Sequence, residues 1–75
     1  MKFYGTSLET VAVLAINEEE FALMMHTEKG NVAIILPEDE RPRIFGTLEE
    51  ATRTADTIGM VSYHPGDTYA KAWIE

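Results

Sequence analysis

Residues 21–36 read FALMMHTEKGNVAIIL, and this stretch decides the fold. Large apolar side chains alternate along 21–27, and a continuous apolar, β-branched run covers 32–36. Both patterns are typical of strands that are buried on one or both faces. The polar residues between them include Gly30, which suits the left-handed position of a three- to four-residue hairpin loop. The stretch therefore predicts two antiparallel strands, the second of which ends at Pro37.

The segment that precedes this hairpin, residues 10–17, is also short, apolar and rich in β-branched residues. It predicts another strand, and Glu18–Glu20 then form the turn into the hairpin. The alternative is a helix that begins at Ser7 as its N-cap. Valine and isoleucine are poor helix formers, so we favour the strand and a three-stranded antiparallel meander.

A helix is the clearest element of the C-terminal half. Thr47 and Glu50 have the spacing of a capping box, in which the Thr47 side chain accepts a hydrogen bond from the Glu50 amide. The helix is expected to run to Ile58 and to stop at Gly59. Glu49 and Arg53 stand four residues apart on its polar side. The apolar stripe consists of Leu48, Ala51, Ala55 and Ile58.

The remaining residues predict a short extended piece at 43–46 and a last pair of strands at 60–64 and 68–74. Pro65 and Gly66 between the last two strands favour a type II turn. The chain is thus predicted to be a single α+β domain, residues 1–75. Its element order is β-β-β-α-β-β, with an antiparallel sheet and one helix packed on one face of it.

Composition excludes several classes of protein. The 75 residues contain no cysteine, which excludes disulfide scaffolds and cysteine-ligated zinc. Thirteen acidic residues against six basic ones give a net charge of −7, which argues against direct binding of nucleic acid. No run approaches the roughly 20 apolar residues of a membrane helix, and the first residues lack the apolar core of a signal peptide. A cytoplasmic location without membrane contact is therefore expected.

Catalytic motifs are missing from the sequence. His26 and His64 lack the spacing of a metal site, and no serine has a plausible histidine–acid set. The five glycines are isolated, so they form no phosphate-binding loop. A chain this short also leaves little room for a ligand pocket of about 300 Å³ beside its core. We predict no enzymatic activity, catalytic residue, metal or cofactor.

Two acidic triplets are the candidate partner-binding site. In the predicted meander the second triplet reaches the same end of the sheet as the first, and this end would attract a basic protein surface. Arg41 and Arg43 follow directly and would offset part of the charge. Solvated turns of no further function are the alternative interpretation. The predicted partner-binding residues are Glu18, Glu19, Glu20, Glu38, Asp39 and Glu40.

A possible dimer face follows from burial. The first and third predicted strands are apolar on both faces, whereas one helix covers only one face of a sheet. The other face is covered either by the curled sheet and the terminal segments, or by a second copy of the chain. Both options remain open at this stage. The residues of the possible dimer face are Leu14, Ile16, Met24 and Ile35.

These features favour a small acidic protein that binds another protein. In size and charge the chain resembles the anti-CRISPR and DNA-mimic proteins, a functional class that shares no fold. The first hypothesis is a phage or mobile-element inhibitor that occupies a basic nucleic-acid-binding surface of a larger host protein. The second is a structural or regulatory homodimer. A third is base stacking on Tyr69 and Trp73 beside Lys71, against which the net charge speaks.

Overall fold

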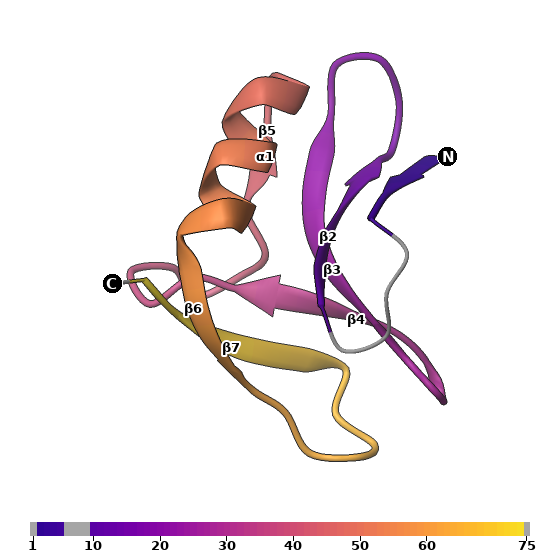
Figure 1. Cartoon of the computed structure of the whole chain (residues 1–75), viewed down its shortest axis with the longest axis vertical. Coiled ribbons are helices and arrows are strands. Elements are labelled where there is room, and N and C mark those ends of the chain that lie inside the picture. Colours follow the sequence, from indigo (N-terminus) through magenta and orange to yellow (C-terminus); the bar gives the residue numbers. More distant parts are fainter. Residues whose placement is uncertain (1, 6–9, 75) are drawn as a thin grey trace.

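The computed structural model describes residues 2–5 and 10–74 of the chain. Within these residues the chain forms one helix and seven strands of a single curled sheet (Figure 1). The strand order is β1-β2-β3-β4-β7-β6, and β5 pairs with β3 off this path. The elements are β1 (Lys2–Tyr4), β2 (Val11–Ala15), β3 (Phe21–Thr27), β4 (Gly30–Ile35), β5 (Ile44–Phe45), α1 (Leu48–Thr57), β6 (Ile58–Ser62) and β7 (Tyr69–Ile74).

The predicted meander is present as β2, β3 and β4. Neighbouring strands are antiparallel, with Val13 opposite Leu23 and Met25 opposite Val32. The alternative of a helix over residues 10–17 is wrong, because β2 is extended and paired with β3. The proposed helix cap at Ser7 lies outside the described residues.

The loop between β3 and β4 is shorter than predicted. Thr27 pairs with Gly30, so the loop has only two residues, Glu28 and Lys29. Gly30 has a φ of +128°, a backbone conformation that residues other than glycine rarely adopt. The Thr27 hydroxyl donates to the Gly30 carbonyl at 2.6 Å and accepts from the Lys29 amide at 3.3 Å. Gly30 correctly predicted a turn. The loop is shorter than predicted, and the hydrogen bonds of Thr27 span it.

Helix α1 begins as the sequence predicts and ends differently. The Thr47 hydroxyl accepts from the Glu50 amide at 3.2 Å, which confirms the N-cap. Ala51 is fully buried, and the other apolar residues of the stripe pack against the core. The helix ends one residue before the predicted bound, but Gly59 does not have the positive φ of the predicted C′ stop. Ile58 is the C-cap and already pairs with Ile74, so the chain passes from helix into strand without a glycine turn.

The sheet is mixed, and this corrects the predicted antiparallel topology. Strands β6 and β7 are antiparallel, as predicted. In the turn between them, Gly66 has a φ of +98° and the Asp67 amide donates a hydrogen bond to the His64 carbonyl at 3.0 Å. Both features are those of a type II turn. However, β7 pairs in parallel with β4. The chain between them includes α1, the kind of crossover that parallel strands need. Strands β1 and β5 also extend the β-β-β-α-β-β order.

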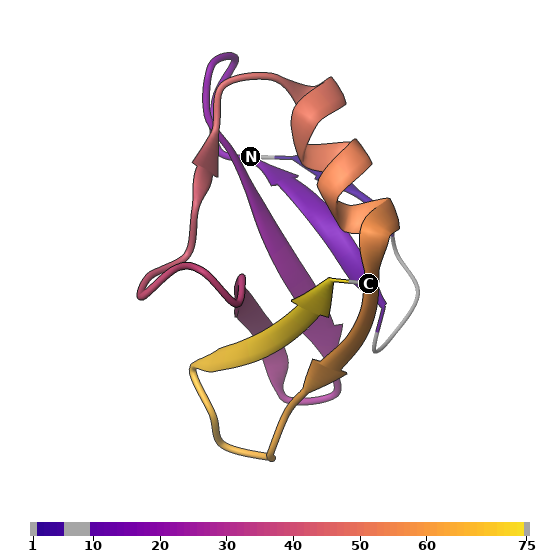
Figure 2. The same cartoon turned by 90° about the vertical axis from the view of Figure 1, so that its left-hand side faces the viewer.

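The core lies inside the curl of the sheet, where α1 packs against β2, β3, β5 and β6 (Figure 2). Ile34 and Leu36 are each 1% exposed and form its centre. On the outer face of the sheet, the face away from α1, Ala12, Ala22 and Ile35 are buried as well. The single chain therefore covers part of both faces.

Candidate functional site

The first acidic triplet, Glu18–Glu20, lies in the turn between β2 and β3, and all three residues are exposed. Both the nitrogen and the oxygen of the Asn17 side-chain amide form hydrogen bonds within this turn. Its nitrogen donates to a Glu20 carboxylate oxygen at 2.6 Å, and its oxygen accepts from the Glu19 amide at 2.8 Å. The Ile16 amide donates to the Glu20 carbonyl at 2.9 Å. The carboxylates therefore stand on an ordered backbone.

The start of α1 brings further carboxylates to the same end of the molecule. In Figures 1 and 2 the β2–β3 turn and the first turn of α1 both lie at the top. Glu49 and Glu50 are exposed in this first turn, where the helix dipole favours negative charge. Glu49 accepts from Arg53 at 2.9 Å. We call Glu18, Glu19, Glu20, Glu49 and Glu50 the acidic end.

The second acidic triplet, Glu38–Glu40, lies elsewhere. Figures 1 and 2 show the loop after β4 well apart from the β2–β3 turn, so the two triplets do not share one edge. The reason is the path of β4, which leaves β3 after Ala33 and continues beside β7. Strand β5 takes the place next to the start of β3. The expectation that the six carboxylates share one edge is therefore wrong, whereas partner binding by either triplet stays a prediction.

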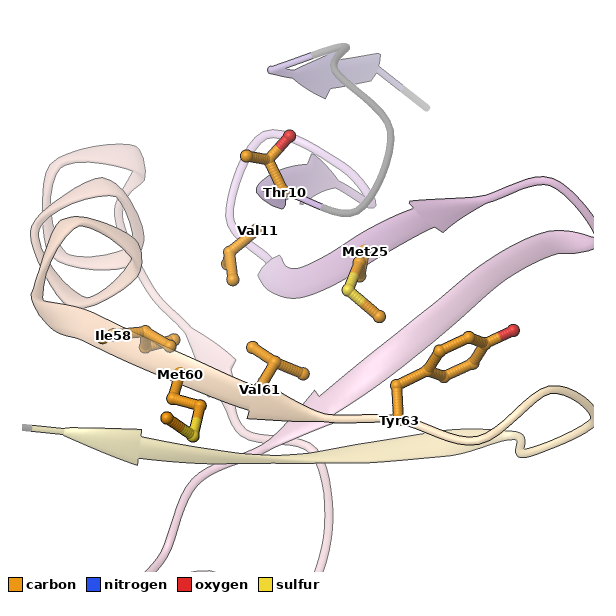
Figure 3. A pocket seen from close by; sticks show the side chains of 8 residues that line it. Thr10, Val11, Met25, Ile58, Met60, Val61 and Tyr63 are labelled. Carbon is orange, nitrogen blue, oxygen red and sulfur yellow. The ribbon is translucent and has the colours of Figure 1, made fainter.

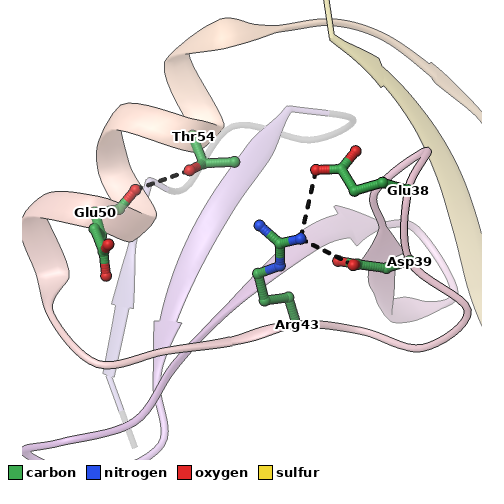
Figure 4. A network of polar contacts seen from close by, with 5 residues as sticks. All are labelled: Glu38, Asp39, Arg43, Glu50 and Thr54. Atoms are coloured by element: carbon green, nitrogen blue, oxygen red, sulfur yellow. Dashed lines mark hydrogen bonds and ion pairs between the residues drawn. The ribbon is translucent and has the colours of Figure 1, made fainter.

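Arg43 binds the second triplet, as Figure 4 shows. Its guanidinium donates to Asp39 at 2.9 Å and to Glu38 at 3.4 Å. The hydrogen bond to Asp39 raises the pKa of Arg43 above its usual value, and the charges of Asp39, Glu38 and Glu50 act in the same direction. The expected offset by Arg43 is therefore present, and the charge of this loop is partly neutralised within the chain.

The residues of the predicted dimer face do not form one exposed surface. Leu14 and Met24 are half-buried, Ile16 lies in the β2–β3 turn, and Ile35 is only 7% exposed because β4 pairs with β7 there. Large exposed side chains of the outer face lie instead on β5, β6 and β7. They are Ile44, Met60, Tyr69 and Trp73. The alternation of residues along 69–74 had indicated that Tyr69 and Trp73 share a face.

A groove lies between β6, the start of β2 and the end of β3 (Figure 3). Its volume is about 430 Å³, larger than we expected for a chain of this length. Val11, Met25 and Val61 line it from facing strands, and Tyr63 lies at its end. No charged residue lines it. Sequence reasoning missed this groove because it depends on how β6 crosses the meander.

Neither histidine lies in this groove, and the His26 ring packs on Phe3 with centroids 4.4 Å apart. Among residues 2–5 and 10–74, no three histidine or acidic side chains are placed to hold a metal ion. No helix in the described part of the chain is long and apolar enough to cross a membrane. No protein-family model, curated protein or solved structure matches the chain.

Proposed function

We propose that this protein is a non-enzymatic binding module whose acidic end docks on the basic nucleic-acid-binding surface of a larger protein. One observation carries the proposal. The β2–β3 turn and the start of α1, which lie at the same end of the molecule (Figure 1), together carry five exposed acidic residues. Carboxylates gathered in this way create a local negative potential that attracts a basic surface and repels phosphate.

The local structure supports presentation of this charge to a partner. In the part of the chain that the structure describes, no ion pair reaches Glu18, Glu19, Glu20 or Glu50. Bonds from Asn17 hold the turn and the Thr47 cap holds the helix start, so little ordering is required on binding. The acidic end therefore has four carboxylates outside any ion pair and one, Glu49, that is paired with Arg53, and its backbone is held by local hydrogen bonds.

Occupation of a nucleic-acid-binding surface would make the protein an inhibitor, because carboxylates would take the positions of phosphates. Small acidic inhibitors that phages and mobile elements encode act in this way, and we propose that the chain is of that functional type. Its own net charge of −7 disfavours a direct contact with nucleic acid. The partner is thus expected to be a basic protein.

The experiment begins with capture of proteins from a host extract on the immobilised chain, followed by purification of the captured protein. The purified candidate is then bound to a labelled DNA or RNA duplex, and the chain is added as a competitor. We expect displacement of the duplex and at least about a tenfold loss of affinity for the chain between 50 and 200 mM salt. Binding that ignores salt, or a ternary complex with the duplex still bound, would contradict the proposal.

A further inference from the structure

A hollow of about 330 Å³ lies beside the acidic end, between β1 and the β2–β3 turn. The pairing of Lys2 with Ala15, the last residue of β2, places β1 next to the chain that enters this turn. The lining combines one carboxylate residue, Glu18, with Tyr4, Ile16 and Lys2. We call this site the Tyr4 hollow.

The Tyr4 ring already carries a cation. The ammonium of Lys2 lies 4.9 Å from the ring centroid, within the roughly 6 Å of a cation–π contact. Tyr4 is 37% exposed and Lys2 is exposed as well, so both are accessible to a partner. Because lysine gives up the freedom of a flexible four-carbon stem when it is held on the ring, a more rigid cation can take its place.

Apolar surface and negative charge complete the Tyr4 hollow. Ile16 is 36% exposed and Phe21 is buried, so the lining offers contact to an aliphatic stem. Glu18 is exposed, and none of the ion pairs within residues 2–5 and 10–74 includes it. A ring face, apolar contact and a carboxylate outside any ion pair are what a long cationic side chain with an apolar stem requires.

Arginine matches these features better than lysine does. Its planar guanidinium is weakly hydrated, stacks on aromatic rings and binds carboxylates through parallel hydrogen bonds, whereas an ammonium is compact and strongly hydrated. We propose that the Tyr4 hollow binds an arginine side chain of the basic partner, with the guanidinium on the Tyr4 ring and beside Glu18, and with Lys2 displaced. This inference rests on the proposed function. It adds a subsite that selects arginine to a surface that otherwise attracts any positive charge.

The test uses two peptides, tri-arginine and tri-lysine, which are titrated into the whole isotope-labelled chain at low salt and followed by NMR. We expect the arginine peptide to bind at least about threefold more tightly and to shift the signals of the Tyr4 ring and the Ile16 methyl groups. Tyr4→Leu should abolish this preference, whereas Tyr4→Phe retains a ring face and should keep it. Tyr69→Leu is the matched control, since Tyr69 is an exposed tyrosine on β7, and it should change neither affinity.

Lys2 provides a second readout. Lys2→Gln removes the cation that arginine must displace and should strengthen binding of tri-arginine about two- to threefold. In the Tyr4→Leu chain the same substitution should strengthen it less, because only the general loss of positive charge remains. Equal affinities for the two peptides, without a shift of the Tyr4 ring signals, overturn the proposal. So does an arginine preference that Tyr4→Leu leaves intact.

Failure of the proposed function would look different. A chain that prefers arginine at the Tyr4 hollow but displaces no duplex from a basic protein refutes the inhibitor and keeps the subsite. A chain that displaces the duplex without any preference for arginine keeps the inhibitor and refutes the subsite.

Discussion

The two acidic triplets have nearly the same composition and quite different environments. Glu18–Glu20 stand in a turn held by Asn17, beside the acidic start of α1. Glu38–Glu40 follow a strand that has turned away, and Arg43 bridges two of their carboxylates. Equal charge in the sequence therefore stays outside any ion pair in the first triplet and is partly neutralised by Arg43 in the second. The difference is decided by the residues that lie next to each triplet in the folded chain.

The largest expected effect comes from charge reversal of one triplet at a time. Glu18→Lys, Glu19→Lys and Glu20→Lys together should weaken binding to the captured basic partner at least about 100-fold. Glu38→Lys, Asp39→Lys and Glu40→Lys change the net charge by the same amount and should weaken it less than about fivefold. Titration calorimetry at one salt concentration measures both. Equal losses would mean that total charge, and not its location, governs binding.

An intermediate effect is expected at the helix start, which distinguishes the first triplet from the second. Thr47→Ala removes the acceptor of the Glu50 amide and should lower the free energy of unfolding by about 1 kcal/mol. Thr52→Ala, at an exposed position inside α1, is the matched control and should be neutral or slightly stabilising. Urea denaturation followed by circular dichroism measures both. The cap has no structural role if the two variants are equally stable.

The smallest effect tests whether Arg43 accounts for the neutrality of the second triplet. Arg43→Ala frees Glu38 and Asp39 and should strengthen binding to the basic partner by at most about twofold at low salt, because the added charge lies away from the acidic end. Arg53→Ala frees Glu49 within the acidic end and should strengthen binding more. Weaker binding of either variant would show that these arginines contact the partner.

Local patterns predicted the elements of this fold well. The apolar alternation of 21–27 gave β3, the capping residues gave the start of α1, and Pro65 and Gly66 gave a type II turn. These features depend on neighbours in the sequence. The end of α1 was predicted to within one residue, but the reason for it was missed, because Ile58 pairs with the distant Ile74 and the chain needs no glycine turn there.

The pairing of strands that are distant in the chain could not be predicted from the sequence. Nothing in residues 32–36 shows that β4 leaves β3 to lie parallel to β7, or that β5 fills the vacated place. This path of β4 separates the acidic triplets and places the buried Ile35 beside β7. The charge could therefore be counted from the sequence, but the acidic end could not be assembled from it.

A competition titration, with the captured partner bound to a labelled duplex, tests the role of the acidic end most directly. The wild-type chain and the Glu38–Glu40 reversal should displace the duplex, and the Glu18–Glu20 reversal should fail to displace it over the same concentration range. Displacement by all three chains alike, or by none of them, would contradict the claim that the acidic end occupies a nucleic-acid-binding surface.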